Sequence, residues 1–153
     1  MSRNLHFVRI YPHPPTRVWQ ALTDPKALTE WLMENDFEPI VGHRFCFRTK
    51  PMPGFDGVVR CEVVEIDAPR RLVYTWQGGG MRQSTLVTWT LEEIAEGTRL
   101  RLEHTGFEGL GGLTASFILG LGWPRLLRWA LPRTLAALDA EMRNGVARSV
   151  APH

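Results

Sequence analysis

The sequence has few cysteines and no long apolar run, and these two scarcities exclude several classes of protein. Only Cys46 and Cys61 occur among 153 residues, too few for a disulfide scaffold and without the spacing of a zinc site. The longest apolar stretch, residues 117–123, is interrupted by glycine and stops at Pro124, far short of the roughly 20 residues of a membrane span. The first residues lack the apolar core of a secretory signal. We therefore expect a cytoplasmic protein with free thiols and no membrane contact.

The charges are nearly balanced and scattered. Eighteen Lys and Arg against 16 Asp and Glu give a net charge of +2, and no basic run forms a tract for nucleic acid. A hydrophobic content of 44% with 22% charged residues is typical of a globular protein rather than a disordered one. The length suits one domain over residues 1–153, and no linker or repeat divides it.

The N-terminal part reads as a strand followed by two short helices. Residues 5–11 are rich in strand-forming types and end at Pro12. Apolar residues at helical spacing follow between 18 and 22. Asp24 and Pro25 have the types preferred at the N-cap and first turn of a second helix.

From residue 43 to residue 104 the apolar period changes to two, which predicts an antiparallel meander of strands joined by short turns. The adjacent Val63 and Val64 break the alternation and predict a β-bulge. The expected inward residues of these strands are Phe45, Phe47, Tyr74, Trp76, Trp89, Leu102 and His104.

After Thr105 the sequence is rich in glycine and then in leucine. We expect residues 106–112 to form a loop that is able to act as a lid, because glycines lower its local stability. A long helix should begin at Leu113, with Phe117, Trp123 and Leu127 among its inward residues and apolar cover on more than one side. Pro124 and Pro132 predict a kink or break at one or both positions.

This order of elements is typical of an α+β fold in which the long helix covers one face of a sheet of about six strands. The bulky inward residues suit a ligand cavity between the sheet and the helix, but from the residues alone a dense core is the stronger expectation, because buried aromatic side chains usually serve packing.

Several segments together resemble a known superfamily. Residues 14–25 (PPTRVWQALTDP), Trp31, residues 68–76 (APRRLVYTW), residues 84–92 (STLVTWTLE), residues 97–107 (GTRLRLEHTGF) and the pair Gly122-Trp123 occur in the order seen in START-like proteins, also called SRPBCC or birch-pollen-allergen-like. The most similar branch is the one named after the activator of the heat-shock-protein-90 ATPase. The resemblance covers nearly the whole chain.

The resemblance implies a helix-grip fold, a curved antiparallel sheet around a long C-terminal helix with an internal cavity. It favours binding of a small hydrophobic or amphipathic molecule (lipid, polyketide or aromatic) without a cofactor. The expected ligand-binding residues are Phe45, Phe47, Tyr74, Trp76, Trp89, Leu102, His104, Phe117, Trp123 and Leu127. A cyclase or dehydrase in the same cavity and a chaperone-interacting module are the alternatives.

Catalytic chemistry has little support in the sequence. His104 either orients a ligand's polar group or is a histidine bonded within the core. No pair of carboxylates is expected on the apolar face, and no histidine spacing indicates a metal. Tyr74 with His104 is the pair we would expect to carry a reaction, and a binding protein is the stronger expectation. The wide apolar face of the last helix also allows a homodimer.

Overall fold

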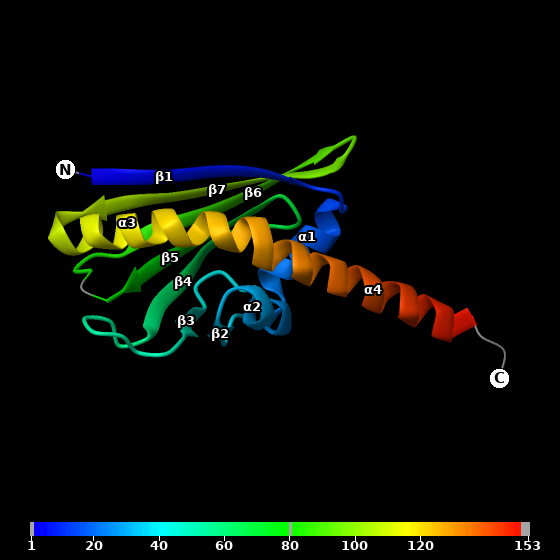
Figure 1. Ribbon diagram of the computed structural model, residues 1–153, viewed down its shortest axis with the longest axis horizontal. Coiled ribbons are helices and arrows are strands. Elements are labelled where there is room, and N and C mark those ends of the chain that lie inside the picture. Colours follow the sequence, from blue (N-terminus) through cyan, green and yellow to red (C-terminus); the bar gives the residue numbers. More distant parts are fainter. Residues whose placement is uncertain (1, 80, 151–153) are drawn as a thin grey trace.

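The computed structural model describes residues 2–79 and 81–150 as one curved sheet with a long helix against it (Figure 1). The elements are β1 (Ser2–Tyr11), α1 (Pro15–Thr23), α2 (Pro25–Trp31), β2 (Glu34–Asn35), β3 (Arg44–Arg48), β4 (Val58–Asp67), β5 (Arg71–Gly78), β6 (Thr85–Ile94), β7 (Gly97–Glu108), α3 (Gly109–Arg125), a π-helical turn (Leu126–Ala130) and α4 (Leu131–Val150). The α+β helix-grip fold is therefore confirmed.

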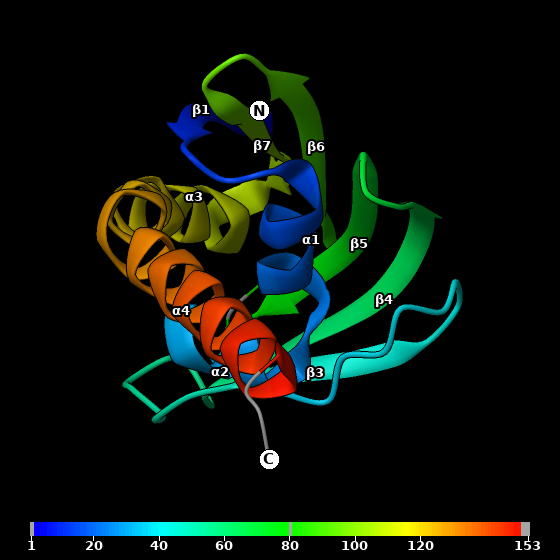
Figure 2. The same cartoon turned by 90° about the vertical axis from the view of Figure 1, so that its right-hand side faces the viewer.

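The sheet is antiparallel throughout, in the order β1-β7-β6-β5-β4-β3-β2. It has seven strands within the described residues, one more than expected, because the two-residue β2 extends its edge. The register between β4 and β5 shifts between Val63 and Glu65, which confirms the predicted bulge. Figure 2 shows the sheet curving around the helical layer.

The two short helices form where the sequence predicts them. Pro15 begins α1, and its apolar residues, Val18, Ala21 and Leu22, are buried. Asp24 caps α2 by accepting a hydrogen bond from the backbone N–H of Lys26 at 3.2 Å. This satisfies one of the N–H groups that a helix start leaves unpaired.

The long helix does not break at either proline. It changes direction across the π-helical turn between them (Figure 1), where the Leu131 N–H bonds to the carbonyl of Leu126 five residues earlier. At the same spacing the carbonyl of Leu127 would accept from residue 132, which is a proline and has no N–H. The Tyr11 hydroxyl donates to that carbonyl instead, at 2.6 Å.

The segment 106–112 is not the expected loop. β7 continues to Glu108 and α3 begins at once at Gly109. Only Gly106 and Gly109 use the left-handed conformation that glycine favours, with φ of +90° and +70°. Gly111 and Gly112 are helical, so the glycines make a sharp strand-to-helix junction and no separate lid.

The first half of α3 presents the opposite face to the one predicted. Among residues 109–122, Gly112 and Ser116 are buried, whereas Leu113, Phe117 and Leu121 are exposed. An added Cβ at Gly112 would lie 3.1 Å from the carbonyl carbon of Phe107, so the backbones approach closely there. Small residues therefore set this contact, and the large apolar ones remain outside. The expected cover on more than one side is wrong for this half.

Candidate functional site

The aromatic residues expected inside are brought together between the sheet and the helix. Phe45 contacts Tyr74 with ring centroids 5.4 Å apart, and Phe47 contacts Trp76 at 5.5 Å. Trp89 meets Trp123 of α3 edge to face at 5.6 Å. Leu102 and Leu127 are buried beside them.

These side chains fill the space between the sheet and the long helix. Each of the nine predicted ligand residues other than Phe117 is at most 3% exposed. A ligand-sized cavity would leave its lining accessible to a water-sized sphere, so this centre is a dense aromatic core. Phe117 is the exception. It is 54% exposed and lies outside this core, because α3 turns its small residues to the sheet.

Tyr74 is held within this core as a neutral group. Its hydroxyl oxygen accepts a hydrogen bond from the indole N–H of Trp89 at 2.9 Å. Burial is the main cause that raises the pKa of the phenol, and this outweighs the hydrogen bond from Trp89. Tyr74 is therefore no proton donor or acceptor near neutral pH.

His104 is the centre of a short hydrogen-bonded chain. The indole N–H of Trp123 points to Nδ1 of His104 at 3.1 Å, so that nitrogen is the acceptor. Nε2 then carries the proton and donates to Oγ1 of Thr85 at 2.7 Å, and Thr85 donates to the carbonyl of Trp76 at 2.8 Å. The chain fixes one tautomer of a neutral imidazole.

This environment makes His104 a structural residue. It is fully buried, and desolvation lowers its pKa from 6.5 to about 3. Both ring nitrogens are bonded to other core groups. Of its two interpretations, the histidine bonded within the core is the one that the geometry supports, and the geometry gives it no free position for acid–base chemistry.

The two free cysteines differ in their surroundings. Cys61 is buried, and desolvation raises the pKa of its thiol. Cys46 is partly exposed. Within the described ranges no three His, Cys, Asp or Glu residues are grouped so that they could hold a metal ion.

A hollow of about 490 Å³ lies at one end of the sheet, where the β5–β6 hairpin meets the start of α3. Its lining is mixed in chemistry: Arg82, Gln83, Glu108, Gly109, Leu110 and Gly111. The antiparallel register places these segments together, because Leu86 of β6 pairs with Thr105 of β7. We call this feature the end hollow.

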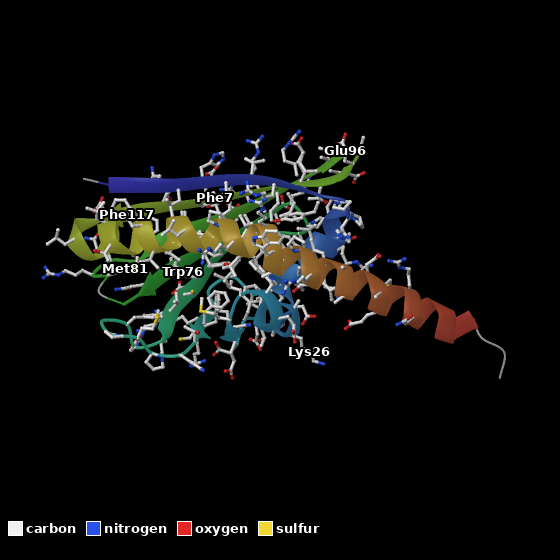
Figure 3. All side chains as sticks on the ribbon, viewed as in Figure 1. Phe7, Lys26, Trp76, Met81, Glu96 and Phe117 are labelled. Carbon is white, nitrogen blue, oxygen red and sulfur yellow. The ribbon has the colours of Figure 1, made fainter. Side chains whose placement is uncertain are left out.

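The end hollow adjoins the aromatic core. Met81 precedes Arg82 in sequence and is buried, and Phe107 precedes Glu108 and contacts His104 with centroids 4.4 Å apart. Figure 3 shows Met81 nearer than Trp76 to the beginning of α3. The sequence pattern does not predict this site, because the glycines of residues 106–112 indicate a loop. The register of the last hairpin was the signal that could have found it.

A second hollow, of about 650 Å³, lies between α2 and α4. Charged side chains of both signs line it, among them Lys26, Glu30, Arg133 and Glu141. It does not reach the aromatic core residues, none of which is in its lining.

The helix that covers the core is unevenly anchored. From Trp123 onward it buries a large side chain in every turn, namely Trp123, Leu127, Leu131 and Leu135. Before Trp123 its buried residues are Gly112 and Ser116. Burial of apolar area supplies most of the stability of a packed helix, so the first half of α3 is the easier part to displace.

Comparisons with known proteins agree with this architecture. Residues 12–136 match the model of the family described as "Activator of Hsp90 ATPase homolog 1-like protein". A comparison with the curated proteins finds no match. Protein MLL2253 from Mesorhizobium loti is 35% identical, with a TM-score of 0.78 over 88% of this chain and 98% of that one.

Two further solved structures are more distant. CalU16 from Micromonospora echinospora is 22% identical and has a TM-score of 0.72, over 97% of this chain and 85% of that one. DynU16, described as a protein in the dynemicin biosynthetic locus, is 25% identical with a TM-score of 0.72. The alignment with DynU16 covers 87% of this chain but 47% of that one. The fold, the family match over residues 12–136 and the 35% identity to MLL2253 lead to one conclusion: this chain belongs to the family of activator of Hsp90 ATPase homolog 1-like proteins, within the START-like (SRPBCC) superfamily.

Proposed function

We propose that this protein binds a small amphipathic molecule at the end of the sheet where the end hollow lies. The polar end of the ligand occupies the end hollow, and its apolar part lies between the sheet and the first half of α3. The observation that carries this proposal is the position of the end hollow beside the weakly anchored half of the helix.

The lining of the end hollow suits a polar group. Arg82 offers a charged donor, Glu108 a charged acceptor and Gln83 both kinds of group, and all three are exposed. Neither Arg82 nor Glu108 forms an ion pair within the described part of the chain, so both are available to a ligand. The volume of about 490 Å³ is in the usual range of small-molecule sites.

The apolar part of the ligand requires the helix to move. The aromatic core is full, so a ligand has room only where a displaced segment gives way. The small residues Gly112 and Ser116 make the first half of α3 the segment that costs least to displace, and the buried Met81 directly precedes Arg82 of the end hollow. The site therefore opens from the end hollow inward and leaves the contacts of Trp123 in place.

Binding is favoured over the cyclase or dehydrase alternative. His104, the one buried histidine among the described residues, is neutral and bonded at both nitrogens, and the buried Tyr74 phenol has a raised pKa. General acid–base catalysis needs a group that changes protonation at a free position, and this core offers none among its described residues.

The test is a fluorescence titration with 8-anilinonaphthalene-1-sulfonate, an anionic aromatic probe. We expect one site per chain and about fivefold weaker binding for Arg82→Gln, because an exposed charge-assisted contact contributes roughly 1 kcal/mol. Arg60→Gln is the matched control, since Arg60 is exposed on β4 and does not line the end hollow. Equal affinities for the three proteins would overturn the assignment of the site.

A further inference from the structure

We propose that the exposed side of α3 docks this protein on the surface of an anionic lipid bilayer. We call this side the outer face and define it by Leu110, Leu113, Phe117, Ile118 and Leu121. The inference does not rest on the proposed ligand. The two sites share Leu110, which also lines the end hollow, and both involve the first half of α3.

The outer face is unusually apolar for a surface. Leu110 is 85% exposed and Leu121 is 73% exposed, and the other three side chains exceed 40%. Contiguous exposed apolar side chains of this kind mark a site of protein or membrane contact. Figure 2 shows α3 at the margin of the molecule, with no other element beyond it.

The charged residues of α3 and of the turn that follows it are all positive, and the one exposed negative charge next to the helix start is Glu108, beside Leu110. Residues 109–138 contain no Asp or Glu, and their charged residues are Arg125, Arg128 and Arg133. At 100° per residue, Arg125 falls on the same side of the helix as Leu110 and Leu121. The charge pattern therefore complements an anionic surface.

An aromatic residue of the interfacial type completes the pattern. Trp129 is 58% exposed, and the guanidinium of Arg128 lies 5.1 Å from its ring centroid. Trp and Arg are the side chains that anchor proteins at the level of lipid headgroups, with apolar residues deeper in the bilayer. The helix carries both kinds of residue: the apolar outer face comes first in sequence, and Arg125, Arg128 and Trp129 follow it.

Surface docking fits these observations better than a membrane span. Within the described residues, the helix Gly109–Asn144 is long and apolar enough to cross a membrane by length and composition, and 22% of its most apolar window is buried. A span would have to pull Trp123, Leu127 and Leu131 out of the core. The exposed side alone can enter the headgroup region without any such loss, which revises the expectation of no membrane contact drawn from the sequence.

A second copy of the chain is a less suitable partner for the outer face than an anionic bilayer. A two-fold contact through the outer face would bring together two helices whose residues 109–138 carry arginines and no carboxylate to pair with them. Lipid phosphates supply the missing anions. Each arginine near such a surface contributes about 1 kcal/mol, which corresponds to a fivefold change in partitioning.

The experiment is vesicle flotation at low salt with two compositions, pure phosphatidylcholine and phosphatidylcholine with a third of phosphatidylglycerol. We expect the protein to float with the anionic vesicles and stay unbound with the neutral ones. Leu121→Glu should reduce partitioning about tenfold, because it removes a buried leucine from the lipid contact. Arg125→Gln and Arg128→Gln should each reduce it about fivefold.

Ile40→Glu is the matched control. Ile40 is 58% exposed, comparable to the residues of the outer face, but lies in the segment before β3. Its variant should float like the wild type. Equal flotation of wild type and Leu121→Glu, or equal binding to neutral and anionic vesicles, would overturn the proposal.

Sedimentation velocity without vesicles tests whether a second copy of the chain binds to the outer face. A dimer that Leu121→Glu dissociates, together with no flotation of the wild type, would assign the outer face to a second copy and also overturn the proposal. The probe titration is done without lipid, so failure of docking and failure of ligand binding are separate results.

Discussion

The buried neutral His104 gives the protein a pH-dependent stability of predictable sign. Burial lowers the pKa of this imidazole to about 3, whereas in the unfolded chain it is near 6.5. Between these values the unfolded chain binds a proton that the folded chain does not. The contribution of the neutral His104 to the free energy of unfolding is therefore fully present above about pH 6.5 and is lost as the pH falls toward 3.

The magnitude follows from the linkage relation. Each pH unit well inside this window costs about 1.4 kcal/mol, and integration from pH 7 to pH 5 gives a loss of about 2 kcal/mol. Domains of this kind have a total stability of roughly 5–15 kcal/mol, so the loss is a large fraction.

The assay is urea unfolding of the wild type and of His104→Phe at pH 7 and at pH 5. The variant leaves the Trp123 indole N–H without its acceptor, which should cost about 1–3 kcal/mol at both values. It lacks the titrating group, so its loss between pH 7 and pH 5 should be about 2 kcal/mol smaller than that of the wild type. The other histidines are present in both proteins and cancel.

One result would refute this reasoning. If the wild type and His104→Phe lose the same free energy of unfolding between pH 7 and pH 5, then His104 is protonated in the folded protein or already accessible to water. The hydrogen-bonded chain through Trp123 and Thr85 would then not describe the core.

Three further predictions concern the helix and the turns. Tyr11→Phe should cost about 1–2 kcal/mol in urea unfolding, because the Leu127 carbonyl loses its only side-chain donor and water would have to replace it; an unchanged midpoint would contradict this role. Gly97→Ala should cost more than about 1 kcal/mol, since φ is +138° and the new Cβ would lie 2.2 Å from the Tyr11 carbonyl oxygen. Gly122→Ala is its counterpart in open helical space and should raise the melting temperature by about 2–4 °C; a neutral Gly97→Ala or a destabilising Gly122→Ala would show that backbone conformation does not decide these sites.

The sheet could be predicted because its signals are local. Alternation of apolar and polar residues set the inward faces of the strands, and Val63 beside Val64 marked the bulge. The cap by Asp24 was likewise visible in the residue types. The extra strand β2 has only two residues and leaves no periodic signal.

The buried face of α3 was harder to predict from the sequence, because its contact with the sheet depends on tertiary packing. A pattern of large apolar residues assigned Phe117 to the core, but close approach to β7 favours Gly112 and Ser116 at that position. The cluster of glycines suggested a loop, yet two of them make the turn and the others are helical. The end hollow depends on which hairpin tip meets which helix start, and no single segment encodes it.

Ligand binding at the end hollow is tested most directly by one measurement. Amide spectra of isotope-labelled protein should be recorded while 8-anilinonaphthalene-1-sulfonate is added. We predict saturable shifts at residues 82–83 and 108–112, extending to the indole signal of Trp76 and sparing the hollow between α2 and α4. Shifts confined to that second hollow, or none at high probe concentration, would contradict the proposed site.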